Sequence, residues 1–293
     1  MAEQWSQQLS WAWAQQRVWS QTANAMKSRI DRARTLGLGL AIGAATLAVA
    51  AVQLAGLSSW AGRSLAAAAA ISAGLGPISQ RRAGTDQVQA WTRARSASEG
   101  LKTEVYAYLA GGSTYTGADR ERRLGERTRG IVADVADLQW HALGITADDK
   151  PVPAVSGIDS YITERVNDQI EGYYRPKAAG YVRRVARLRN VADLLAVISV
   201  VFAAMAAAFD IEGLAALVPV VTTVATSVVA YVAAARYDHM IVEFLRTAQR
   251  LEQLAGSQAD TPTEPAAFVD ACEAAISIEN QGWMARWVSD ENN

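Results

Sequence analysis

The sequence predicts an all-α membrane protein: four transmembrane helices arranged as two hairpins, long cytoplasmic helices, and a tandem parallel repeat. Three observations lead to this fold class. The chain contains four long apolar blocks, positive residues flank them asymmetrically, and both halves of its 293 residues follow the same order of segments. A mean hydropathy of only +0.03 conceals the pattern, because the apolar residues are concentrated in the blocks.

The apolar blocks cover residues 36–57, 60–79, 191–209 and 213–235. About twenty helical residues at 1.5 Å each cross a hydrocarbon core of roughly 30 Å, so each block is a candidate span. The second block contains Arg63 and the third contains Asp193, which makes these two spans marginal. The alternative is a soluble bundle of four buried helices, although such helices rarely extend this far without a polar face.

Two acidic residues, Asp210 and Glu212, stand between the third and fourth blocks, in "FAAMAAAFDIEGLAALVPV". Charged side chains in a long apolar stretch predict the turn of a membrane hairpin, held in water. The corresponding turn of the first pair is the segment 58–63, in which Trp60 suits the depth of the membrane interface.

Basic residues stand at the block ends that face away from these turns. They are Lys27, Arg29, Arg32, Arg34, Arg81, Arg82, Arg175, Lys177, Arg183, Arg184, Arg187, Arg189 and Arg236. The positive-inside rule therefore predicts cytoplasmic termini and a cytoplasmic central segment. Arginine far outnumbers lysine and alanine is abundant, which is typical of a GC-rich bacterial genome.

The two halves are residues 1–142 and 158–293, separated by a linker at 143–157 that contains two prolines and two glycines. Related letters recur in "YLAGGSTYTG" at 108–117 and "QLAGSQADTP" at 253–262, and both segments are expected to be loops. Each half has an even number of spans, so both repeats should have the same orientation.

Composition argues against several functional classes. A net charge of −1 gives no basic surface for nucleic acid, and Cys272 is the only cysteine, so no intrachain disulfide is expected. We find no phosphate-binding glycine loop, and no metal or cofactor site is expected. Asp134, Asp137 and His141 form the only tempting polar cluster, and a solvated helix face explains them. The sequence therefore predicts no catalytic residues and no enzymatic activity.

A polar and aromatic stripe opens the second half. Tyr161, Arg165, Gln169 and Tyr173 recur at a spacing of four residues, which places them on one face of a helix. We interpret this stripe as a docking face for another helix or subunit, and a solvated face is the alternative.

The second half of the chain contains, in order, "YITERVNDQIEGYYRPKA" with the stripe, the arginine-rich run, the hairpin, "FLRTAQRLEQLAG" and "FVDACEAAISIENQGW". Through these segments it resembles the SLATT family of two-transmembrane effector domains. The matching positions are Tyr161, Arg165, Gln169, Tyr173, Tyr174, Lys177, the 254–256 loop, Phe268, Glu279 and Trp283. The first half resembles a diverged copy, through Trp91, Glu99, Leu101 and "YLAGGS". The resemblance implies a membrane-permeabilising effector in nucleotide-linked bacterial defence.

Polar and small residues inside the spans give the remaining candidates. Gln53, Thr222, Thr223, Thr226 and Ser227 are candidate pore-lining residues, or they bond to their own or a neighbouring helix. Small residues permit close helix contact in lipid. We therefore list Gly39, Gly43 and Gly74 as helix-packing candidates, within the chain or between chains.

These observations lead to two hypotheses. The first is an oligomeric inner-membrane effector that forms a pore or channel, with the lipid bilayer, further copies of itself and a nucleotide-signal sensor or synthase as partners. The alternative is a non-conducting membrane scaffold that recruits partners through its cytoplasmic helices.

Overall fold

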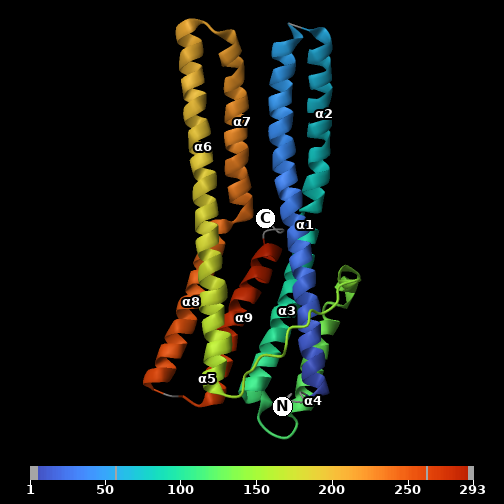
Figure 1. Cartoon of the computed structure of the whole chain (residues 1–293), viewed down its shortest axis with the longest axis vertical. Coiled ribbons are helices and arrows are strands. Elements are labelled where there is room, and N and C mark those ends of the chain that lie inside the picture. Colours follow the sequence, from blue (N-terminus) through green and yellow to red (C-terminus); the bar gives the residue numbers. More distant parts are fainter. Residues whose placement is uncertain (1–5, 57, 262, 290–293) are drawn as a thin grey trace. The chain divides into compact units, whose positions relative to one another are not determined.

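The computed structural model describes residues 6–56, 58–261 and 263–289; within these ranges the side chains at 212, 234 and 278–289, which include Glu279 and Trp283, lie outside the description. This part of the chain is 87% helical and contains no strand. In order, its elements are α1 (Gln7–Ala55), α2 (Ser59–Arg82), α3 (Thr85–Ala110), η1 (Ser113–Tyr115), α4 (Arg120–Ala133), η2 (Ala136–Ala142), α5 (Ile158–Tyr161), η3 (Ile162–Tyr174), α6 (Arg175–Phe209), α7 (Glu212–Ala235), α8 (Tyr237–Asp260) and α9 (Pro265–Ser289) (Figure 1).

The chain forms two compact units that cut across the two sequence halves. The first, which we call the helical unit, takes the chain up to Ser28, then Thr85–Ala178, and then from Ile241 on. The second, the hairpin unit, takes Arg29–Gly84 and Ala179–Met240. Each half therefore contributes one helical hairpin to the hairpin unit and its flanking helices to the helical unit.

In the hairpin unit, α1 and α2 form the first hairpin (Figure 1). A close contact near its turn requires glycine. A Cβ on Gly62 would lie 2.8 Å from Ala55 Cα and 3.0 Å from the carbonyl oxygen of Ala51. The Ser58 hydroxyl accepts a hydrogen bond from the Ala61 N–H at 3.4 Å and caps α2. The glycine and the cap together fix how the chain leaves the turn.

The second hairpin consists of α6 and α7, and its turn lies at Asp210. Asp210 has a φ of 54°, a left-handed conformation that aspartate tolerates better than most residues. The predicted position of this turn is confirmed. The hydroxyls of Ser199 and Thr222 lie 2.9 Å apart and join the two helices farther along.

Within the described residues, three helices are long and apolar enough to cross a membrane: Gln7–Ala55, Ile158–Phe209 and Gly213–Asp260. Helix α2 is not among them, although its 24 residues would suffice in length. Arg63 near one end, Gln80–Arg82 at the other, and the serines and glycines between them lower its apolar character. The predicted span at 60–79 is thus a helix whose insertion remains a prediction.

The glycines expected to mediate helix packing make no close contact with the described residues. A Cβ built on Gly39, Gly43 or Gly74 meets nothing within 4 Å, and packing between chains at these positions stays a prediction. The close approaches occur instead at Gly62 and at Gly37, whose Cβ would lie 3.4 Å from the Ser79 Cβ. The spacing of small residues in these alanine-rich helices did not distinguish Gly37 and Gly62, which lie in close contacts, from the other glycines.

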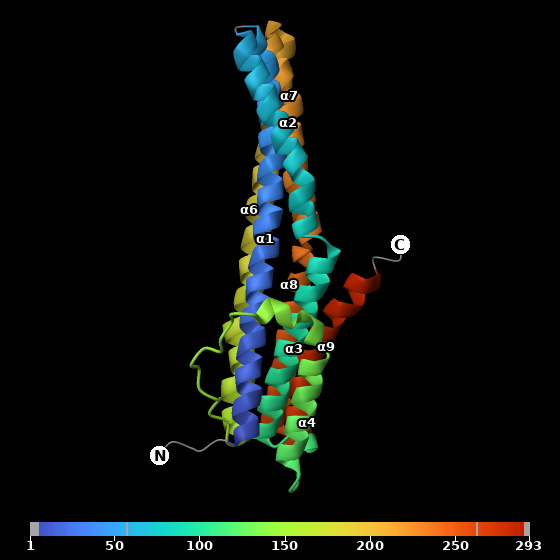
Figure 2. The same ribbon diagram turned by 90° about the vertical axis from the view of Figure 1, so that its right-hand side faces the viewer.

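The helical unit contains a dense core in which α3, α4 and α9 lie side by side (Figure 2). The tryptophan-rich start of α1 joins this core: Trp19 is buried, and Trp13 Nε1 donates to the Lys150 carbonyl oxygen at 3.0 Å. The segment 143–157 is non-helical up to the start of α5, and its Asp148 pairs with Arg17 of α1.

The two similar segments after α3 and within α8 adopt different structures. Helix α3 ends at Ala110, and Gly111 continues with a φ of 75°, as the predicted loop requires. Helix α8, by contrast, continues to Asp260, so the predicted loop at 253–262 is wrong over most of its length. The second segment contains the single Gly256, which a helix accommodates at modest cost.

Candidate functional site

The main polar feature of the helical unit is a buried ion pair between η3 and α9. Arg165 Nε donates to Glu273 Oε1 at 2.8 Å, and Arg165 Nη2 donates to Glu273 Oε2 at 2.7 Å. The two side chains are 0% and 5% exposed. A planar guanidinium facing a carboxylate in this way gives a strong and directional contact.

Two neutral side chains complete the coordination of this carboxylate. The Tyr161 hydroxyl donates to Glu273 Oε1 at 2.9 Å, and the Thr103 hydroxyl of α3 donates to Glu273 Oε2 at 2.8 Å. The Arg165 guanidinium also lies over the ring of Tyr106, 4.7 Å from its centroid. We call Thr103, Tyr161, Arg165 and Glu273 the three-helix lock, because it joins α3, the α5–η3 helix and α9.

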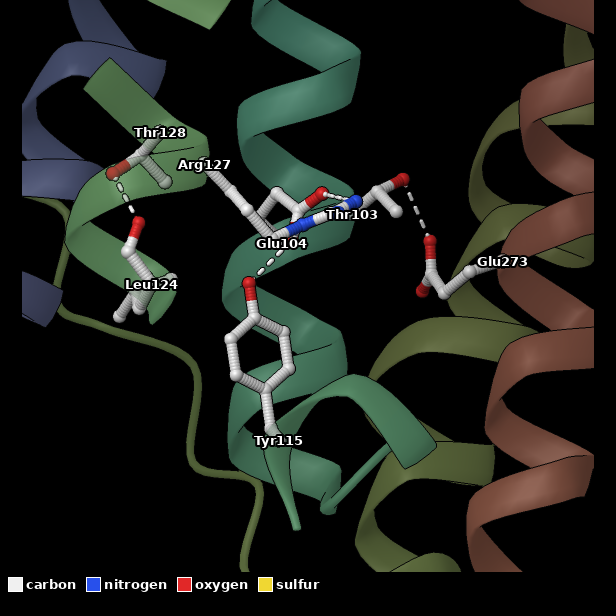
Figure 3. Close-up of polar contacts among 7 residues, drawn as sticks. All are labelled: Thr103, Glu104, Tyr115, Leu124, Arg127, Thr128 and Glu273. Atoms are coloured by element: carbon white, nitrogen blue, oxygen red, sulfur yellow. Dashed lines mark hydrogen bonds and ion pairs between the residues drawn. The ribbon is translucent and has the colours of Figure 1, made fainter. Parts of the chain in front are cut away.

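A second buried carboxylate lies on the other side of α3. Glu104 accepts hydrogen bonds from Arg127 Nε at 2.8 Å and Arg127 Nη2 at 2.6 Å, and another from the Tyr115 hydroxyl. Glu104 is buried, whereas the Arg127 side chain is 53% exposed. Figure 3 shows the neighbours Thr103 and Glu104 pointing in different directions, Thr103 toward Glu273 and Glu104 toward Tyr115 and Arg127. Helix α3 therefore connects both clusters.

The environment keeps Arg165 charged and Tyr161 neutral near neutral pH. Burial would by itself lower the pKa of Arg165, but the charge and hydrogen bonds of Glu273 raise that pKa above its ordinary value. Burial and the Glu273 charge raise the pKa of the Tyr161 phenol well above 10.0. Neither group exchanges a proton readily at pH 7, so the arrangement suits a fixed structural contact better than acid–base chemistry.

The lock is flanked by two titratable groups with displaced pKa values. Burial, followed by the nearby charge of Arg165, lowers the pKa of Lys102 to about 8. Burial, followed by the charge of Glu273, raises the pKa of the Cys272 thiol to about 12. Near neutral pH, Lys102 thus loses its proton more readily than an ordinary lysine, whereas the Cys272 thiol remains protonated.

The predicted docking stripe makes contacts inside the chain. Tyr161, Arg165 and Gln169 are buried, and the first two belong to the three-helix lock. Tyr173 is partly exposed and accepts a hydrogen bond from Arg95 of α3. The stripe therefore docks against other helices of the same chain, one of the two roles expected for it.

The four serine and threonine hydroxyls of the fourth apolar block donate to carbonyl oxygens one turn earlier in α7. The acceptors of Thr222, Thr223, Thr226 and Ser227 belong to Val218, Pro219, Thr222 and Thr223, at 2.7–2.9 Å. Back-bonding of this kind satisfies each hydroxyl in lipid without water. Gln53 near the end of α1 is exposed. Pore lining by these five residues remains a prediction.

The polar cluster near the end of the first half does not come together on one helix. Asp134 follows α4, whereas Asp137 and His141 lie on η2. Asp137 forms an ion pair with Arg93 at 2.7 Å, and His141 stacks on Trp140. No group of three or more His, Cys, Asp or Glu residues that could hold a metal occurs in the part of the chain that the structure describes.

Sequence reasoning missed the acceptor of the lock. Glu273 lies on the α9 face that also carries Val269, Cys272 and Ile276, all of them buried. A carboxylate on an otherwise apolar helix face signals a buried partner, so this signal was available in the sequence. The roles of Thr103, Glu104 and Tyr115 were not foreseeable from spacing, because their partners lie on other helices.

Two family models match the chain. Residues 161–283 match the SMODS and SLOG-associating 2TM effector domain 1 (SLATT), and residues 17–123 match a protein family of unknown function, DUF4231, which is related to SLATT. No curated protein and no solved structure matches the chain. The SLATT match contains the α6–α7 hairpin and three residues of the lock, Tyr161, Arg165 and Glu273. The second match contains most of α1, together with α2 and α3. The match of residues 161–283 to the SLATT family of two-transmembrane effector domains, together with the long apolar helices, points to a membrane effector protein.

Proposed function

We propose that this chain is an oligomeric effector that permeabilises the inner membrane in nucleotide-linked bacterial defence. It has no enzymatic activity of its own and needs no cofactor in this proposal. Both termini lie in the cytoplasm, and a partner that senses or makes a nucleotide signal triggers the effector. The SLATT domain supports the effector class, and the apolar helices support the membrane location.

One observation carries the proposal: the helix that holds Arg165 of the lock continues into a candidate membrane span. The segment Ile158–Phe209 is helical throughout and contains an apolar stretch long enough to cross a membrane. Residues Ile162–Tyr174, which include Arg165, form a π-helix that continues directly into the α-helix α6, so a shift of the lock passes along one helical segment. Opening or closing the three-helix lock is therefore a means of moving the span.

Permeabilisation requires several chains. In the most apolar window of each of the three long helices, only 6% of the residues are buried within the chain. The remaining surface faces lipid or other copies, and two hairpins are too few to enclose a wide water-filled path. We therefore propose a homo-oligomer in which α7 contributes Thr222, Thr223, Thr226 and Ser227 to the path.

The test is dye and ion flux from liposomes that contain the purified full-length chain, with growth arrest on expression as a second readout. The variant changes Thr222, Thr223, Thr226 and Ser227 to valine. Thr46→Val is the matched control, because the Thr46 hydroxyl is also exposed and donates to a carbonyl one turn earlier, but lies on α1.

Flux and growth arrest that the quadruple variant loses and Thr46→Val retains would support a pore with α7 in its wall. Flux unchanged in the quadruple variant would keep the pore and remove this lining. A wild-type chain that is inactive in both assays would contradict permeabilisation and favour the scaffold, which would then need a recruiting surface other than the buried Tyr161–Arg165–Gln169 stripe.

A further inference from the structure

The hairpin unit contains a groove of about 670 Å³ between the first hairpin and α7. This volume lies within the range of small-molecule and lipid-sized sites. Its walls are mostly small apolar residues of α1 and α2, among them Gly37, Ala41, Ala73 and Gly76, with Ala230 from α7. The small side chains create the groove, since larger ones at these positions would fill it.

The length of the groove matches one leaflet of a bilayer. Its lining runs along α1 from Ala33 to Ala44 and along α2 from Ser72 to Ala83, eleven helical steps on each. Eleven steps at 1.5 Å span about 16 Å, and half of a hydrocarbon core is roughly 15 Å. An extended acyl chain of a single leaflet therefore fits along it.

Apart from the serines Ser72, Ser79 and Ser227, the polar side chains of the lining gather at one end. Arg34 on α1, Gln80 on α2 and Tyr231 on α7 all lie at the span ends opposite the hairpin turns. The Tyr231 hydroxyl also receives a hydrogen bond from Arg184 at 3.0 Å. Arg34 has no ion-pair partner among the described residues, and the residues that line the groove include no carboxylate. This end is therefore complementary to an anion at the depth of the lipid headgroups.

We propose that the groove binds an anionic phospholipid of the leaflet at the arginine-rich end of the spans. One acyl chain occupies the alanine- and glycine-lined wall, and the phosphate lies against Arg34, with Tyr231 and Gln80 as hydrogen-bonding neighbours. The lipid would then hold the first hairpin and α7 together. This inference depends on the membrane location and not on pore formation.

The test is native mass spectrometry of the full-length chain, extracted from vesicles of phosphatidylglycerol and phosphatidylcholine in equal amounts. The filling variant is Gly76→Leu, because a Cβ there meets nothing within 4 Å and the position lines the groove. Its matched control is Gly74→Leu on the same helix, where the space is equally open but outside the groove lining.

We expect the wild-type chain and Gly74→Leu to retain phosphatidylglycerol, and Gly76→Leu to lose it. Arg34→Gln should reduce the preference for phosphatidylglycerol by about fivefold, the effect of one basic residue near anionic lipid. Arg32→Gln, at an exposed position outside the lining, should leave the preference unchanged.

Equal lipid retention by Gly76→Leu and Gly74→Leu would overturn the proposal, as would equal retention of both lipids by the wild-type chain. A Gly76→Leu chain that keeps its lipid but loses its oligomeric state would assign the groove to a second copy instead. Because lipid retention is measured without flux, failure here leaves the proposed function standing, and failure of flux leaves the lipid site standing.

Discussion

Arg165 and Glu273 form a buried bidentate ion pair although 108 positions separate them in the chain. Removing both charges from water is costly, and here the Tyr161 and Thr103 hydroxyls offset part of that cost by also donating to the carboxylate. Removing either partner leaves the other as a buried, unpaired charge, which should lower the stability of the helical unit strongly.

We expect Glu273→Ala to lower the free energy of unfolding by about 3–5 kcal/mol, because it leaves Arg165 buried and unpaired. In a chain of this size, that corresponds to a melting temperature lower by about 10 °C in detergent, measured by tryptophan fluorescence. The double variant Arg165→Met/Glu273→Leu should recover most of the loss, since it buries no charge.

The control for this prediction is Glu126→Ala, which removes an exposed ion pair with Arg122 whose side chains are 57% and 59% exposed. Exposed pairs contribute at most about 1 kcal/mol. If Glu273→Ala shifts the melting temperature no more than this control does, the lock does not stabilise the helical unit.

Lys102 predicts a pH dependence of stability. Its pKa falls from an ordinary 10.5 to about 8 in the folded chain, mainly through burial. Between these values the unfolded chain binds more protons than the folded one, so the free energy of unfolding rises as pH increases through this window. Lys102→Met should be more stable than wild type at pH 7. Its free energy of unfolding should also lack the increase with pH that Lys102 causes.

Melting temperatures at pH 7.0 and 9.5 test this prediction, with Lys150→Met as a control at an exposed lysine. The difference between the two pH values should shrink in Lys102→Met and stay at the wild-type value in Lys150→Met. An identical difference in all three proteins would show that Lys102 carries its proton in the folded chain as in the unfolded one.

The Cys272 thiol should be unreactive in the folded protein. Its side chain is fully buried and its pKa is about 12, so at pH 8 the reactive thiolate is roughly 1,000-fold rarer than in an ordinary cysteine. Maleimide labelling should be more than about 100-fold slower in the native chain than after unfolding.

A Ser257→Cys chain that also carries Cys272→Ser supplies the comparison, because position 257 is exposed on α8 and should label rapidly. Rapid labelling of native Cys272 would mean that the contact of α9 with the rest of the helical unit opens readily.

Gly62 should tolerate no larger side chain. A Cβ at this position would lie 2.8 Å from Ala55 Cα, so Gly62→Val forces α1 and α2 apart at the turn. Overpacking of this kind costs about 1–3 kcal/mol, which should lower both the melting temperature and the yield of folded protein.

Gly74→Val on the same helix has open space around it and serves as the control. Equal melting temperatures for the two variants would show that the first hairpin does not form the close contact at Gly62.

The sequence was most informative where one residue suffices to determine local structure. The uncharged stretch before Asp210 and the charge of Asp210 itself located the second hairpin turn, because water is required there whatever the rest of the fold does. It was less informative where two helices must meet: Gly39 and Gly62 are both small, but only the partner helix decides which of them is in contact.

The candidate site shows the same division. Helical spacing correctly placed Tyr161, Arg165 and Gln169 on one face, but did not identify what covers that face. The partners of Arg165 are Glu273, over a hundred residues away, and the ring of Tyr106 from the other half of the chain. The spacing of residues within the α5–η3 helix does not reveal these partners.

By itself, the sequence determined that this is a helical protein with long apolar segments, where its second hairpin turns, and that its second half resembles a SLATT domain. These properties depend on residue type and spacing along one element. Tertiary structure alone decided that the polar stripe is an internal lock, that Gly62 is the close contact, and that small residues of three helices leave a groove. Such features depend on which elements meet, because burial and pairing are properties of two surfaces and not of one.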